Sequence, residues 1–304
     1  MTQPIFFGLG AAFATALCQS AADIGTKAAT REAEERLILA AEWCVGAVVL
    51  CVLCLLAHPA LILRPATAFA QLVTPDFWPL VFASTGLNVI AYFFFVRAFR
   101  LAEASLVAPL VLLTPVLLLV TSPLMLGERV SPLGGAGVVL SVAGAILLAS
   151  SAPGARPSAS LQAFLRDEGV QSMGLTAAIW SVTANLDKLG VRASTPAIWI
   201  AVVTSCISLA SVALWLALPH RPMRLRALRW AFAAGAANAL GNAAQMYALT
   251  LLFVPYVIAI KRMSALFTVI FGGLALGENI RGRLPGAVVM FAGAALVALA
   301  QQGQ

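Results

Sequence analysis

Ten apolar runs divide the chain, and each is long enough to cross a lipid bilayer as a helix. A transmembrane helix needs about 20 mostly apolar residues. The runs, whose edges are soft, lie at residues 4–24, 36–57, 77–99, 104–126, 133–150, 170–190, 196–218, 230–251, 255–276 and 284–301. None shows the period-two alternation of a transmembrane β-strand. The pattern predicts an all-α membrane protein with ten transmembrane helices, in which 58–76 and 151–169 are the longest connections.

Composition and charge agree with a lipid environment. Hydrophobic residues make up 61% of the 304 residues and charged residues only 10%, whereas a soluble domain carries roughly 25% charged residues. The net charge of +7 does not indicate a nucleic-acid partner, because the basic residues are scattered between the apolar runs. Most of them lie in the connections after the odd-numbered runs, and by the positive-inside rule this places both termini outside.

The two halves of the chain resemble each other. Residues 88–128 match residues 238–278 at a constant offset. Each half contains five runs, and since five is an odd number the two copies must cross the bilayer in opposite directions. Inverted repeats of this kind place a solute site near the bilayer midplane, between the copies. We therefore expect a first five-helix repeat at 1–152, a connecting loop at 153–168 and a second five-helix repeat at 169–304.

Both repeats carry short motifs that are shared with a known family. The sequence Leu-Gly-Glu closes the fourth run at 126–128 and the ninth run at 276–278, and the next run contains Gly137 and Gly144 or, in the second copy, Gly286 and Gly293. Together with the ending Gln245-Met-Tyr247-Ala-Leu249 of the eighth run, this pattern resembles the EamA-type transporters of the drug/metabolite transporter superfamily over nearly the whole chain. The resemblance implies a multi-pass protein of the plasma (inner) membrane that carries small metabolites, often outward, without a nucleotide-binding domain. It also implies cytoplasmic termini, so the orientation stays open between this and the charge count.

Two adjacent basic residues, Lys261 and Arg262, lie inside the ninth run. A charged side chain at the bilayer centre costs at least about 2.5–3.5 kcal/mol, and these two lie roughly 10 Å from the start of the run at a rise of about 1.5 Å per residue. One interpretation is that both side chains form the positively charged part of a cavity that binds an anionic or amino-acid-like solute. The other is that both side chains extend (snorkel) to the nearer lipid headgroups. Their counterparts in the first repeat, Val111 and Leu112, are apolar, so the repeat itself does not require the charges.

Two acidic residues inside apolar runs, Asp187 and Glu42, are candidates for proton coupling. Burial favours the neutral form of a carboxyl group, which is what proton coupling requires. Asp187 could instead be the counter-charge of Arg262, or it could pair with basic neighbours at the end of the sixth run. Glu42 could instead bind a cationic group or lie at the membrane interface.

Polar side chains of the eighth run share one helical face. Asn238, Asn242 and Gln245 recur at i, i+4 and i+7, a spacing that places them on one side of a helix. They could line a solute cavity, or they could join helices, since amides in a bilayer contribute about 1 kcal/mol each to helix association. The counterparts of Asn238 and Asn242 in the first repeat are Asn88 and Tyr92. The second repeat therefore offers amides on this face, and the first repeat offers an amide and an aromatic ring. Further candidates for substrate contact are Gln19, Asn185, Trp180 and Tyr247.

Other repeated or helix-breaking residues have structural interpretations. Glu128 and Glu278 close the Leu-Gly-Glu motifs, where they could be structural or could contact loop arginines as part of a gate. Pro109, Pro115 and Pro123 predict a bend in the fourth run.

The sequence favours a secondary transporter over an enzyme. It contains no GxxxxGK[ST] loop for ATP and no GxSxG or HExxH motif. Cys51 and Cys54 form a CxxC motif without a second such motif or a nearby histidine, so we expect inert thiols, no metal and no cofactor. The expected partners are a small-molecule substrate, the lipid bilayer and protons as the candidate coupling ion, and the chain is expected to be a monomer or a weak homodimer. The alternative functions are a lipid flippase and a channel-like pore.

Overall fold

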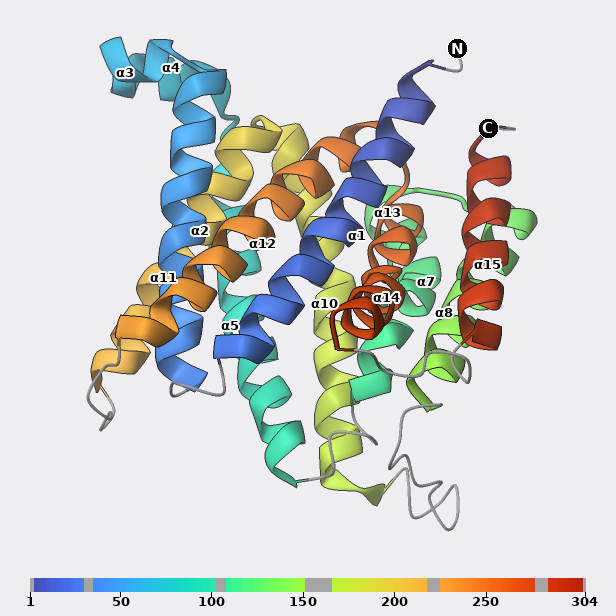
Figure 1. Ribbon diagram of the computed structural model, residues 1–304. Coiled ribbons are helices and arrows are strands. Elements are labelled where there is room, and N and C mark those ends of the chain that lie inside the picture. The colour runs from blue at the N-terminus through green and yellow to red at the C-terminus, as the bar shows by residue number, and fades with distance from the viewer. Residues whose placement is uncertain are drawn as a thin grey trace. The chain divides into compact units, whose positions relative to one another are not determined.

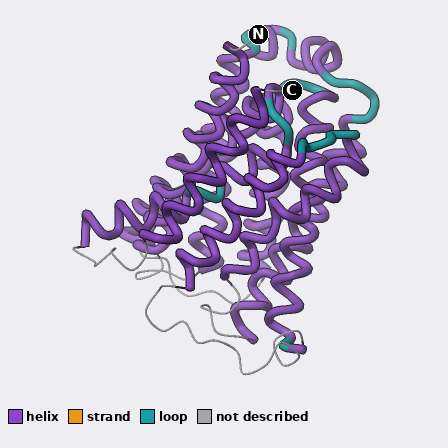
Figure 2. Tube along the Cα trace, turned by 90° about the vertical axis from the view of Figure 1, so that its right-hand side faces the viewer, coloured by secondary structure: helices purple, strands orange, loops and turns teal. Residues whose placement is uncertain are grey.

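The described chain is helical and exposes large apolar side chains. The computed structural model describes residues 3–29, 35–101, 108–150, 166–217, 225–276 and 284–302, and Figure 2 shows helices and turns but no strand among them. On the helix surfaces Leu124 is 80% exposed and Leu56 is 71% exposed. Water penalises contiguous apolar surface, whereas lipid covers it. The fold is therefore that of an all-α membrane protein, as the sequence predicts.

The long helices coincide with apolar runs, because a backbone in lipid must satisfy its hydrogen bonds within the segment. In chain order they are α1 (Gln3–Ala29), α2 (Glu35–Ala57), α5 (Phe77–Leu101), α8 (Pro132–Ser150), α10 (Glu168–Ala193), α11 (Pro196–Ala217), α12 (Leu225–Leu251) and α15 (Leu284–Gln302) (Figure 1). The connection at 58–76 adds two short helices, α3 (Ala60–Leu63) and α4 (Pro65–Leu72).

Not every predicted span is long and apolar enough to qualify as one. Among the described residues, four segments qualify by length and composition, namely Gln3–Thr26, Leu37–Ala57, Phe77–Ala98 and Pro196–Ala217, and the shorter apolar helices are Leu110–Leu126, Pro132–Leu147 and Pro285–Ala300. Helices α10 and α12 have 26 and 27 residues, but polar side chains lower their mean hydropathy. The total of ten crossings therefore stays a prediction.

Two predicted spans, 104–126 and 255–276, are wrong as single helices. The described part of the first consists of the 3₁₀ helix η1 (Ala108–Leu113) followed by α7 (Thr114–Leu126), and the second consists of α13 (Val254–Lys261) followed by α14 (Ser264–Leu276). Both α7 and α14 have 13 residues. The first and last residues of α14 are the repeat counterparts of the first and last residues of α7. The two interruptions therefore occupy equivalent places in the two sequence repeats.

Local chemistry accounts for each interruption. Pro115 lies in the first turn of α7 and has no N–H to donate to the Val111 carbonyl four residues earlier. The Thr114 hydroxyl donates to that carbonyl instead (2.7 Å). Around Arg262 the backbone tightens to i→i+3 hydrogen bonds, from the Met263 N–H to the Ile260 carbonyl (2.9 Å) and from the Ala265 N–H to the Arg262 carbonyl (3.2 Å). The helix type thus changes just before Pro115, and the bend of the fourth run stays a prediction.

The chain divides into two compact units, each of which takes segments from both sequence repeats. The first unit comprises residues 1–9, 86–185 and 251–304, and the second comprises residues 10–85 and 186–250. In the first unit α8 packs along α15, and in the second α2 packs along α11. These helices contain the fifth and tenth runs and the second and seventh runs. In each unit, therefore, a helix of the first sequence repeat packs along the corresponding helix of the second repeat.

The contact between α8 and α15 is antiparallel and reciprocal. A Cβ atom on Gly137 would lie 2.8 Å from the carbonyl oxygen of Gly293, and one on Gly144 would lie 2.8 Å from the carbonyl oxygen of Gly286. The order ascends along α8 and descends along α15, so the helices run in opposite directions. Gly137 corresponds to Gly286 in the repeat, and Gly144 to Gly293. The same pair of surfaces thus meets twice, as in an isologous two-fold contact.

Hydrogen bonds show that α2 and α11 are also antiparallel. His58 Nε2 lies 2.9 Å from Thr195 Oγ1 at one end of the pair, and Ser208 Oγ donates to Cys44 Sγ (3.3 Å) toward the other. All five cysteines are free thiols. Cys54 is buried, Cys51 is exposed, and the other three are half-buried.

Candidate functional site

Two adjacent positive charges of the first unit lie at the interruption between α13 and α14. Lys261 ends α13, and Arg262 follows it as the C-terminal capping residue. Arg262 Nη2 donates a long hydrogen bond (3.4 Å) to Thr114 Oγ1, and the Thr114 hydroxyl donates to the Val111 carbonyl (2.7 Å). Since Thr114 begins α7, the guanidinium of one interruption contacts the other interruption. This contact favours the cavity interpretation of Arg262 over snorkelling.

Helix ends explain why these charges are tolerated and what they could bind. Cations at a helix C-terminus complement the helix dipole, which applies to Lys261 and Arg262 at the end of α13. The free backbone N–H groups at a helix N-terminus attract anions, and Arg262 adjoins the first turns of both α7 and α14. Both basic side chains are half-buried. The arrangement suits a carboxylate or another small anion.

Three aromatic rings form a cluster between α5 and α10 in the same unit. The ring centroids of Tyr92 and Trp180 are 6.0 Å apart at 75°, and those of Phe95 and Trp180 are 5.5 Å apart at 40°. Phe95 packs with Val111 on the buried pair Ala98 and Met173, so the cluster borders the residues that lead to the first interruption. Asn88 is half-buried on α5, one turn before Tyr92. The rings offer edge-to-face contacts to an apolar group.

Asn185 serves as a link between α10 and α7. Its side chain is fully buried. It accepts from Ser122 Oγ (2.6 Å) and donates to Thr121 Oγ1 (3.0 Å) and to the Ser181 carbonyl (2.9 Å). These bonds use both N–H donors and one of the two acceptor sites of the Asn185 amide. They favour a role in joining helices over contact with substrate. The hydroxyl partners on α7 were not identified from the sequence, because serine and threonine occur throughout the chain.

Glu128 binds the start of α13. Its Oε2 accepts a hydrogen bond (2.9 Å) from the backbone N–H of Val254, and the residue is buried. A carboxylate at a helix N-terminus is stabilised by the dipole and satisfies a donor that the helix leaves free. Glu128 therefore positions the broken helix that carries Lys261 and Arg262. Its counterpart Glu278 lies outside the described residues.

A row of polar side chains on α1 reaches Glu42 in the second unit. Gln19 Nε2 donates to Asp23 Oδ1 (2.9 Å), and Thr26 Oγ1 donates to Glu42 Oε1 (2.6 Å). Gln19, Asp23 and Thr26 are spaced to share a helical face. Gly235 of α12 packs on the backbone of Glu42, where a Cβ atom would lie only 2.5 Å from the Glu42 carbonyl oxygen. Glu42 thus lies half-buried at a junction of three helices.

The polar face of α12 belongs to the second unit as well. Asn242 Nδ2 donates to Asn238 Oδ1 (3.4 Å), which confirms that the two share a face, and Gln245 is buried. Tyr247 is 49% exposed, so its ring faces the outside of the helix packing and contributes less to a pocket than the amides do.

Asp187 is hydrogen-bonded to a buried tryptophan. Trp199 Nε1 donates to Asp187 Oδ1 (3.0 Å), and the Trp199 ring packs on Gly190, where a Cβ atom would overlap it. None of the interpretations from the sequence anticipated this partner, because Trp199 lies in the next helix among other large apolar residues. Asp187 and Arg262 belong to different units, and their pairing stays a prediction.

Comparison with known proteins supports the fold and the family. The profile of the EamA-like transporter family matches residues 6–150 and 169–299. A protein of known crystal structure superposes with a TM-score of 0.79 at 18% sequence identity, over 97% of this chain and 98% of its own. That likeness concerns the fold alone. No curated protein sequence matches the chain.

Proposed function

Because the chain belongs to the EamA-like transporter family, a family of membrane transporters rather than enzymes, we propose that it is a secondary transporter that exports a small organic metabolite by alternating access. We place it in the plasma (inner) membrane as a monomer or weak homodimer. The repeats at 1–152 and 169–304 would each contribute five spans in opposite orientations, and the solute would bind near the bilayer midplane between these repeats.

The pair of helix interruptions carries this proposal. Transporters with inverted repeats bind solutes where transmembrane helices are broken, because the free ends of the half-helices bind charged groups. Here the interruptions occupy equivalent places, and Arg262 connects them by its hydrogen bond to Thr114. The charge of Lys261 and Arg262 favours an anionic or amino-acid-like solute. Tyr92 and Trp180 of the same unit would contact an apolar part of it.

Alternating access also needs two repeats that are related by inversion, so that each repeat can adopt the conformation of the other. The reciprocal glycine contacts of α8 and α15 support an inverted relation of the repeats, because only antiparallel counterparts can meet twice through the same surfaces. The amides Asn238, Asn242, Gln245 and Gln19, and separately Asn88, stay candidates for contact with the solute.

Counterflow in proteoliposomes tests the function. Liposomes loaded with one unlabelled metabolite should accumulate the same labelled metabolite transiently, and the rate should saturate with concentration. Carboxylates and amino acids are the first compounds to screen. A linear, unsaturated flux would indicate a channel-like pore, movement of labelled lipid between leaflets would indicate a flippase, and either result would contradict the proposed carrier.

Proton coupling is expected to act through Glu42, with Asp187 as the second candidate. An imposed pH gradient should accelerate counterflow-competent transport in the wild type, and Glu42→Gln, which keeps a hydrogen-bond acceptor for Thr26, should remove the acceleration without abolishing exchange. Asp187→Asn provides the comparison, because it retains an acceptor for Trp199. Transport that is indifferent to the gradient in the wild type would exclude both carboxylates from this role.

A further inference from the structure

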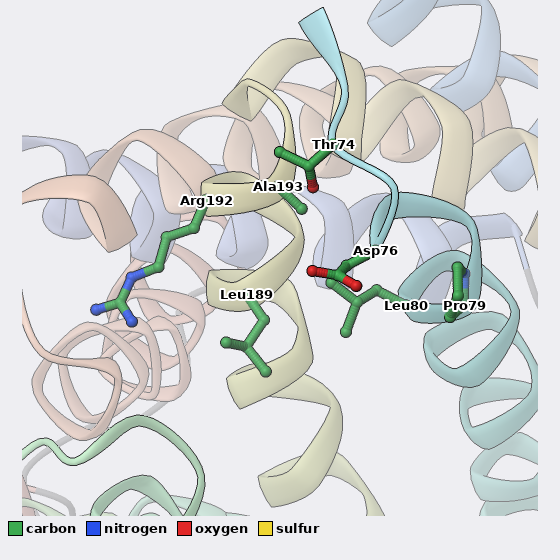
Figure 3. A pocket seen from close by; sticks show the side chains of 7 residues that line it. All are labelled: Thr74, Asp76, Pro79, Leu80, Leu189, Arg192 and Ala193. Carbon is green, nitrogen blue, oxygen red and sulfur yellow. The ribbon is translucent and has the colours of Figure 1, made fainter.

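A groove with two opposite charges lies where α10 ends and α5 begins (Figure 3). It is open to the outside, has a volume of about 510 Å³ and is lined by Thr74, Asp76, Pro79, Leu80, Leu189, Arg192 and Ala193. The Thr74 N–H donates to the Ala193 carbonyl (2.8 Å), so the loop before α5 is held against the last turn of α10. All of the lining residues belong to the second unit, and the groove is therefore a feature of that unit alone.

The two charges of the groove do not neutralise each other. Asp76 and Arg192 are exposed, and within the described part of the chain neither forms a hydrogen bond or an ion pair through its side chain. Figure 3 shows them on opposite sides of Leu189, with the Arg192 side chain directed away from Asp76. Each charge also complements the dipole of the helix end beside it, but that role does not require both to border one groove. Their shared groove offers an acceptor and a donor to a ligand that carries both charges.

We infer that this groove binds a zwitterion, through an ammonium group at Asp76 and a carboxylate or phosphate at Arg192. A guanidinium matches the two oxygens of such an anion bidentately, and Pro79, Leu80 and Leu189 provide apolar contact for an aliphatic side chain. A ligand with one charge would leave the other residue unmatched. The inference rests on the proposed function, in that a transported zwitterion would occupy the groove at one end of its path. An ethanolamine phospholipid headgroup has the same chemistry.

Equilibrium binding to the purified full-length chain in detergent tests the inference with two soluble probes. L-Leucine represents a free solute, and glycerophosphoethanolamine represents a headgroup without its acyl chains. Asp76→Asn and Arg192→Gln should each weaken binding by about tenfold or more, the loss expected for one hydrogen bond to a charged group. Arg192→Lys should bind with intermediate affinity. Isoamylamine and 4-methylpentanoate, which carry one charge each, should bind the wild type as weakly as L-leucine binds the variants.

The control and the outcomes separate this site from the transport site. Arg64→Gln removes an exposed arginine outside the groove and should leave binding unchanged. Dependence of L-leucine binding on both residues supports a solute site, and dependence of glycerophosphoethanolamine alone supports a headgroup site. If the wild type binds neither probe, or if the two variants bind both probes normally, the inference is overturned. Binding is measured without transport, so a negative binding result does not bear on counterflow. A failed counterflow assay would remove the role of the groove in transport but not its binding of the probes.

Discussion

Replacing both Lys261 and Arg262 by methionine is expected to abolish counterflow while leaving the fold intact. Methionine keeps the apolar length of each side chain and removes its charge. A hydrogen bond to a charged group contributes about 1.5–3 kcal/mol, so loss of two such bonds should lower the affinity for an anionic solute by roughly 10²–10⁴-fold. Initial rates of counterflow in proteoliposomes measure the loss, and the thermal unfolding temperature in detergent reports on the fold.

Two further variants make this experiment decisive. Arg64→Met removes an exposed arginine between α3 and α4 and should transport normally. Arg262→Lys keeps the charge but loses the planar fork that binds a carboxylate bidentately, so it should retain part of the activity. Saturable transport at the wild-type rate by the double methionine variant would mean that both cations only stabilise the C-terminus of α13, and that the solute is bound without them.

The helical fold could be predicted because, in a membrane protein, the length of an apolar run directly indicates a helix that crosses the bilayer. A helix that crosses the bilayer must be apolar over about 20 residues, and the edges of α2, α5 and α11 lie within a few residues of those predicted from the sequence. The interruptions were missed for the same reason. Most residues around Leu113 and around the Lys261–Arg262 pair are apolar, so an interrupted helix and a continuous one are hard to tell apart by hydropathy. Only the backbone hydrogen bonds distinguish the two.

The candidate site was only partly predictable, because a polar side chain in a membrane can bind a solute or another helix with the same residue type. Spacing correctly placed Asn238 and Asn242 on one face. It could not show that Asn185 is occupied by partners on α7, or that Asp187 accepts from Trp199. Those partners are distant in the sequence, and which hydroxyl or indole they involve is decided by tertiary packing.

The glycine contacts between α8 and α15 predict the largest effect on stability. A Cβ atom on Gly144 would lie 2.4 Å from the backbone nitrogen of Met290, and a backbone atom cannot move aside as a flexible side chain would. Gly144→Ala should therefore force the two helices apart. Overpacking of this kind costs about 1–3 kcal/mol, so we expect the unfolding temperature, measured by circular dichroism in detergent, to fall by several degrees. Gly293→Ala, whose Cβ atom would lie 2.4 Å from the Ser141 backbone nitrogen, should have a similar effect.

Gly135 provides the matched control in the same helix. No heavy atom lies within 4 Å of a Cβ atom added there, and alanine is favoured over glycine in a helix by about 1 kcal/mol. Gly135→Ala should therefore leave the unfolding temperature unchanged or raise it slightly. If Gly144→Ala and Gly135→Ala unfold at the same temperature, then α8 and α15 do not meet at backbone distance. The reciprocal contact that supports an inverted relation of the repeats would then be lost, because it depends on that close approach.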